Sequence, residues 1–215
     1  MMSDMTMSLS SGAVLVGLGA FHGVNPGMGW LFAVALGMQE RRRGAVLGAL
    51  LPLGLGHALA VGAAVVVAVL AGVVLPLHWL RWLVAAILAA LGISRLFWHR
   101  HPRWASMRVS AGALTLWSFL MASAHGAGLM VVPLFLRMST TMQHDHPHMA
   151  MASMTPTSAL FATSLHAAGY LIVTAVVAFV VFEKLGVGML RKAWFNLDLI
   201  WALTLIATGV ISVML

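Results

Sequence analysis

Four histidines stand inside long apolar runs of the sequence, where ionisable side chains are rare. Neutral imidazole is a ligand that suits zinc, nickel, cobalt and copper, and an ionisable residue within an apolar span is a functional candidate by default. The chain contains no cysteine, so thiolate metal sites, disulfides and iron–sulfur clusters are excluded. We predict that four imidazoles converge on a transition-metal ion: those of His22, His57, His125 and His166.

Polar neighbours of these histidines extend the predicted site. The stretch FHGVNPG places Asn25 and Pro26 close to His22. Proline removes a backbone donor, so the helix should bend or open there, and the Asn25 amide could ligate the ion or order a water. Ligating histidines bond their other ring nitrogen to a neighbour, and the polar candidates for that role are Asn25, Ser123 and Ser164.

A second group of metal-ligating residue types lies between the fourth and fifth apolar runs. The segment 138–156, MSTTMQHDHPHMAMASMTP, is rich in histidine and methionine. Short histidine-rich tracts indicate metal binding, and thioethers favour copper. We expect loose capture of ions by His144, Asp145, His146, His148, Met142 and Met149. Asp198, the candidate carboxylate within an apolar run, is predicted to lie on the ion path.

The elements that must position these residues are membrane helices. Of the 215 residues, 61% are hydrophobic and 8% charged, whereas soluble domains carry about 25% charged residues. Six runs have roughly the 20 apolar residues that a helix needs to cross a bilayer. The sequence therefore predicts an all-α integral membrane protein with six transmembrane helices, at about 11–37, 45–74, 79–97, 111–137, 158–182 and 195–215.

The basic residues indicate how these helices are oriented. Ten of the twelve lie after the first, third and fifth runs, and only Arg81 and Arg137 lie on the opposite side. Cytoplasmic loops carry the excess of Lys and Arg, so both termini are expected outside a bacterial-type inner (cytoplasmic) membrane. The net charge of +7 is then explained by topology, and no nucleic-acid partner is expected.

The two halves of the chain resemble each other. Span one carries FHGVNPG and span four AHGAGLM, while spans two and five carry GHALAVG and LHAAGYL. Spans three and six align without a gap. Three helices per copy is an odd number, so the second copy must enter the membrane inverted. The predicted units are a first repeat (1–98), a cytoplasmic linker (99–110), and a second repeat (111–215) with the external loop 138–156.

The first two spans resemble those of known metal transporters. They carry HGVNPGMGWLFAVALG followed by LGLGHALAVG, which is similar to the NicO-type nickel/cobalt transporters and the hydrogenase/urease-accessory nickel permeases of the LysE-like superfamily. The resemblance implies six helices, metal-ion transport and a tendency toward export. Those families place an acidic residue and a second histidine one turn after the first, where this chain has Met28, Gly29 and Trp30. The resemblance therefore implies transport of a metal ion rather than of a particular metal.

These patterns together predict a transporter that moves nickel, cobalt, zinc or copper through a midplane histidine site, with export favoured. Two alternatives stay open: a membrane haem-binding redox protein, and an accessory subunit that hands metal to a larger membrane complex. No serine–histidine–acid set, paired carboxylates or nucleotide-binding loop is present in the sequence, so we do not expect an enzyme. The expected partners are the metal ion and the bilayer, and the sequence leaves a homo-oligomer or a partner subunit open.

Overall fold

The computed structural model describes residues 2–74, 76–97, 110–141, 156–185 and 197–214. These residues are helical almost throughout, and no strand occurs among them, which confirms the predicted all-α class. The helices are α1 (Met2–Val24), η1 (Pro26–Met28), α2 (Trp30–Glu40), α3 (Arg43–Val74), α4 (Leu77–Phe97), α5 (Ala111–Ala124), α6 (Ala127–Thr141), α7 (Pro156–Val180), η3 (Val181–Leu185) and α9 (Leu197–Met214).

The first predicted span is broken at its centre. α1 ends at Val24, Asn25 is extended (φ −70°, ψ 122°), and the 3-10 turn η1 precedes α2. This confirms the break expected at Pro26, because a proline both lacks the backbone donor and disfavours helical geometry in the residue before it. Gly29, with a φ of 134°, supplies a conformation that side-chain-bearing residues rarely adopt.

The fourth predicted span is broken as well, without a proline at the break. α5 ends at Ala124, and α6 begins at Ala127 at an angle of 56° to it. Gly126 has a φ of 70°, which provides the turn. The two broken spans occupy corresponding places in the two halves of the sequence.

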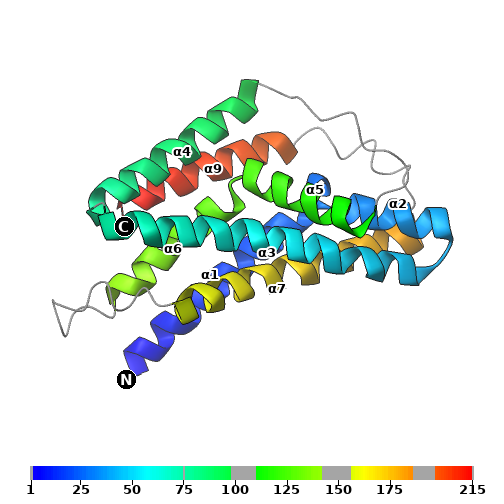
Figure 1. Cartoon of the computed structure of the whole chain (residues 1–215), viewed down its shortest axis with the longest axis horizontal. Helices are drawn as coiled ribbons and strands as arrows, with labels where there is room; N and C mark the ends of the chain where they lie inside the picture. Colours follow the sequence, from blue (N-terminus) through cyan, green and yellow to red (C-terminus); the bar gives the residue numbers. More distant parts are fainter. Residues whose placement is uncertain (1, 75, 98–109, 142–155, 186–196, 215) are drawn as a thin grey trace.

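Three pairs of helices make the most extensive contacts. α1 packs along α7, α3 along α5, and α4 along α9 (Figure 1). Glycines allow these close approaches. A methyl group at Gly92 would lie 2.9 Å from the Ala202 carbonyl oxygen, and one at Gly209 would lie 3.1 Å from that of Ala85. The α4–α9 contact is therefore reciprocal.

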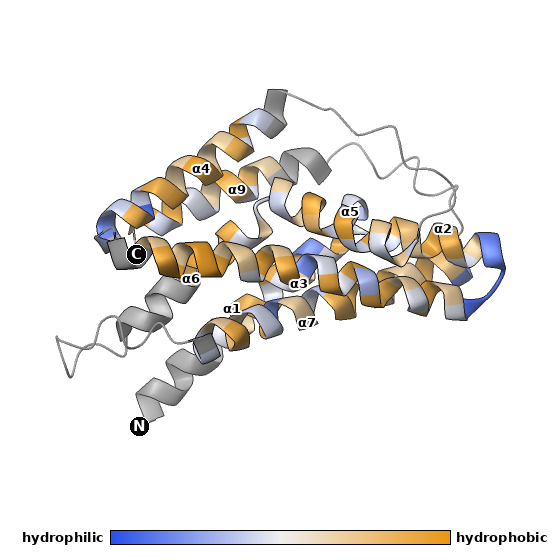
Figure 2. Cartoon of the chain, viewed as in Figure 1, coloured by the Kyte–Doolittle hydropathy of each residue, from blue (hydrophilic) through white to orange (hydrophobic). Residues whose placement is uncertain are grey.

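Large apolar side chains remain exposed on most of the described helices. On α3, Leu47, Leu51, Leu55 and Leu59 are each more than half exposed and recur every four residues, so they share one face. Figure 2 shows hydrophobic residues along the helices and a strongly hydrophilic turn between α2 and α3. Soluble monomers seldom expose apolar surface this continuously, so the surface suits a lipid environment.

Two described helices are long and apolar enough to cross a membrane, Arg43–Ala71 and Thr157–Lys184. A third is added if the bent pair Ala111–Ala124 and Ala127–Leu134 counts as one span. This is fewer than the six spans predicted. The remaining apolar helices, Ser11–Val24, His78–Ser94 and Ala202–Met214, have between 10 and 17 residues within the described part of the chain.

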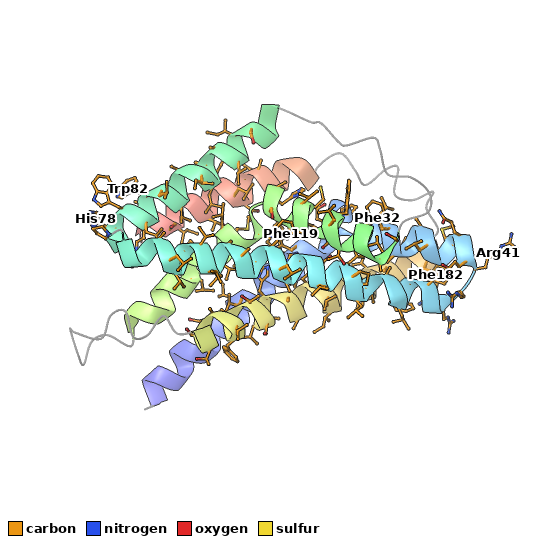
Figure 3. The ribbon with its side chains drawn as sticks, viewed as in Figure 1. Phe32, Arg41, His78, Trp82, Phe119 and Phe182 are labelled. Atoms are coloured by element: carbon orange, nitrogen blue, oxygen red, sulfur yellow. The ribbon has the colours of Figure 1, made fainter. Side chains whose placement is uncertain are left out.

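The two ends of the bundle differ in their side chains. Arg41 lies at one end, and His78 and Trp82 lie at the other (Figure 3). At the Arg41 end, Arg43 Nε lies 2.6 Å from Glu183 Oε1, which joins the start of α3 to η3. The α1 start and the α9 end both lie toward the opposite end, apart from each other (Figure 1).

Candidate metal site

Three of the four predicted ligands meet inside the bundle. His22 on α1, His57 on α3 and His166 on α7 are fully buried. Their ring centroids are separated by 5.0 Å (His22–His166), 5.3 Å (His57–His166) and 5.6 Å (His22–His57). A metal ion 2.0–2.1 Å from a nitrogen of each of three tetrahedrally arranged imidazoles would separate the centroids by about 5 Å. The spacing of the rings therefore suits a shared ion.

Two of the histidines make the same hydrogen bond in the two halves of the chain. His22 Nδ1 lies 2.7 Å from the Leu18 carbonyl oxygen, and His125 Nδ1 lies 2.8 Å from that of Met121. Each partner is four residues earlier in the same polypeptide. Because Nδ1 must carry the proton to donate, Nε2 of each neutral ring keeps the lone pair that a metal would accept.

These main-chain carbonyls take the place of the hydrogen-bond partners that the sequence suggested. Ser123 and Ser164 are exposed, so that part of the prediction is wrong. Side-chain direction explains the error, because a residue two positions from a histidine faces away from it on a helix. His125 itself is buried, 3% exposed, at the break between α5 and α6.

His57 and His166 carry nitrogens whose hydrogen-bonding capacity is not used within the described part of the chain. Neither Nδ1 nor Nε2 of either ring makes a hydrogen bond of ordinary geometry there. A buried polar group left in this state costs about 1–3 kcal/mol. The fold thus keeps two desolvated imidazoles where an apolar side chain would be cheaper, which is typical of a binding site.

The orientation of the rings differs from that of a loaded metal site. The planes of His57 and His166 are stacked, only 8° from parallel. Lone pairs lie in the ring planes, and stacked parallel planes share no point at which one ion could bind both. In agreement, no group of three or more His, Cys, Asp or Glu side chains among the described residues is arranged to hold a metal. Binding would require His57 or His166 to rotate.

A tyrosine sets the plane of His57. Tyr170, fully buried on α7, stacks on His57 with centroids 3.9 Å apart and planes 7° from parallel. Its hydroxyl donates to the Met28 carbonyl oxygen at 2.6 Å. Tyr170 was not among the residues predicted from the sequence, although it is the one tyrosine of the chain and lies within an apolar run.

The Asn25 side chain caps the turn that follows the break. Its Oδ1 accepts a hydrogen bond of 2.9 Å from the Gly27 N–H at the start of η1. Main-chain carbonyls at the break that lack a helical hydrogen bond accept one from a tryptophan side chain. Trp30 Nε1 donates to Val24 O at 2.9 Å, and Trp117 Nε1 donates to Gly27 O at 3.4 Å. Irregular backbone inside a membrane requires such partners.

The other predicted residues fall elsewhere. Asp198 lies in the first turn of α9. Residues 138–141 of the predicted loop belong to α6. Residues 99–109 of the predicted linker and 142–155 of the predicted loop are outside the described residues. So are the predicted capture ligands, His144, Asp145, His146, His148, Met142 and Met149.

Comparison of the chain with protein-family models, curated proteins and solved structures found no match.

Proposed function

We propose that the protein is a multi-pass membrane transporter that moves a transition-metal cation through the buried histidine cluster. The observation that carries this proposal is the meeting of His22, His57 and His166, fully buried and from three different helices, beside a broken span. Discontinuous helices next to a buried polar site are typical of secondary transporters.

The proposed architecture is six transmembrane helices in two inverted three-helix repeats. The helix pairs support it. In the two repeats α1 corresponds to α5, α3 to α7, and α4 to α9. A two-fold exchange therefore converts the α1–α7 pair into the α5–α3 pair and maps the α4–α9 pair onto itself. The spacing of 117 residues that aligns Gly92 with Gly209 also aligns Ala85 with Ala202, and these are the residues of the reciprocal contact. A two-fold axis in the membrane plane produces such reciprocity.

The charge of the site favours either loose binding of a divalent metal ion or binding of a soft monovalent one. The buried polar residues that the structure describes are histidines, Asn25, serines and Thr174, with no carboxylate among them. Neutral imidazoles leave a divalent charge uncompensated in a low dielectric, so a divalent ion would be held loosely, as transport requires. A monovalent copper ion suits the same ligands with less unbalanced charge. We propose export as the direction, on the family resemblance.

Transport into sealed vesicles tests this function. Purified protein reconstituted into vesicles should move at least one of Zn²⁺, Ni²⁺, Co²⁺ and Cu⁺, measured by metal release or uptake. His57→Ala and His166→Ala should each slow transport about tenfold or more, because each removes a ligand. His78→Ala is the matched control, since His78 is exposed at the end of the bundle.

Two results would redirect the proposal. A Soret absorption band in the purified protein, lost in His57→Ala, would support the haem-binding alternative. Metal binding at the cluster without movement of any of the four ions would support the accessory subunit.

A further inference from the structure

We propose that Tyr170 couples metal occupancy of the histidine cluster to opening of the broken span, an inference that rests on the proposed function. Tyr170 is a positioning residue: it sets the plane of His57 and holds the two sides of the break together. The conformation described is then the closed one, in which Tyr170 stacks on His57 and bonds to Met28.

Tyr170 contacts both sides of the break. Before the break, α1 approaches its backbone through two glycines: a methyl group at Gly23 would lie 2.6 Å from the Tyr170 carbonyl oxygen, and Gly19 lies against its amide nitrogen. After the break, its hydroxyl bonds to the Met28 carbonyl oxygen in η1. Tyr170 therefore bridges α1 and η1 from α7, in addition to the bond from Trp30 Nε1 to Val24 O that crosses the same break.

The ring of Tyr170 ties this contact to the ligands. It stacks on His57, and His57 in turn stacks on His166. As long as the three rings remain parallel, His57 and His166 cannot direct lone pairs at one ion. A metal that binds both must turn His57 off Tyr170, or turn His166. Turning His57 removes the face against which the Tyr170 ring packs, and so removes one support of the hydroxyl bond to Met28.

The second half of the chain lacks this device. The spacing that aligns His57 with His166 pairs Tyr170 with Val61, and the spacing that aligns His22 with His125 pairs Met28 with Val131. Both valines are fully buried, and neither side chain can donate a hydrogen bond. Among the described residues, the position that corresponds to Tyr170 therefore offers no equivalent hydrogen bond, and the second break serves as an internal control.

Cysteine labelling tests the hydrogen bond without any metal. The chain has no native cysteine, so Met28→Cys provides a single thiol at a position only 1% exposed. Adding Tyr170→Phe keeps the ring and removes the donor. We expect the thiol reagent to label Cys at position 28 about tenfold faster, which corresponds to ~1.4 kcal/mol, an ordinary value for a buried hydrogen bond.

The matched control is Val131→Cys, whose labelling rate should be unchanged by Tyr170→Phe. Equal rates at position 28 with and without the hydroxyl would overturn the proposal. So would an equal acceleration at both positions, since that would show general loosening of the fold.

A second measurement keeps Tyr170 intact. Because the chain has one tyrosine, fluorotyrosine labelling gives a single ¹⁹F resonance. Zn²⁺ bound in a His57-dependent manner should shift that resonance, and bound Zn²⁺ with an unchanged resonance would overturn the coupling. Absence of bound Zn²⁺ would instead contradict the proposed function for this ion, while the metal-free labelling comparison would still decide the role of Tyr170.

Discussion

At the scale of single residues, the buried histidines divide into two kinds. His22 and His125 each use Nδ1 on a carbonyl one turn away, so their rings are fixed in one tautomer. His57 and His166 have no such bond within the described residues. The first pair is pre-oriented for ligation by hydrogen bonds, whereas His57 is held in its present plane by stacking on Tyr170 and His166.

This division predicts opposite effects on stability and function. His57→Leu should leave the free energy of unfolding unchanged or raise it by about 1–3 kcal/mol, because it removes a buried, unbonded polar group. It should also abolish metal transport. Thermal unfolding in detergent measures the first effect, and a loss of stability comparable to that of Leu53→Ala, a buried core truncation on the same helix, would show that His57 is structural.

At the scale of helices, the sequence predicted continuous elements better than broken ones. Runs 45–74 and 79–97 correspond closely to α3 and α4, since length and hydropathy decide such helices. Pro26 predicted the first break, between α1 and η1. The second, at Gly126, has no proline, and its positive φ becomes evident only in the folded chain.

The close approach of α1 to α7 predicts different effects of alanine at two glycines of α1. Gly19 packs against the main chain of α7, whereas Gly17 has nothing near the position of an added methyl group. Gly19→Ala should destabilise the protein by about 1–3 kcal/mol through overpacking. Gly17→Ala, the matched control, should be neutral or stabilising by up to about 1 kcal/mol, because alanine is the better helix former.

Denaturation of the two variants in the same detergent measures this difference. Equal stability of Gly19→Ala and Gly17→Ala would contradict the close α1–α7 contact that brings His22 and His166 together.

At the scale of the whole molecule, the arrangement of the site depended on contacts that the sequence does not display. The sequence identified the four histidines by residue type and depth in the spans. It could not show that Tyr170 stacks on His57, because that contact depends on how α3, α7 and η1 cross. Nor did the sequence show that the Asn25 oxygen caps the turn after the break.

Single cysteines at the two ends of the bundle test its orientation in the membrane. Arg41→Cys and His78→Cys each place a thiol at an exposed position, at opposite ends of the bundle. In sealed right-side-out vesicles, an impermeant thiol reagent should label the cysteine at position 78 and leave that at position 41 unlabelled until the vesicles are opened, because basic loops face the cytoplasm. Labelling of both before opening would contradict the proposed orientation.

Metal binding by the purified protein tests the central claim most directly. Replacing His144, His146 and His148 by serine first removes the predicted loop ligands from the measurement. In that background, the chain should still bind one of Zn²⁺, Ni²⁺, Co²⁺ and Cu⁺, with X-ray absorption giving nitrogen ligands; for zinc the distance should be about 2.0–2.1 Å. His57→Ala and His166→Ala should each abolish this binding, and His78→Ala should retain it. Undiminished binding in both cluster variants, or no binding of any of the four ions by the parent, would contradict a metal site at the buried histidines.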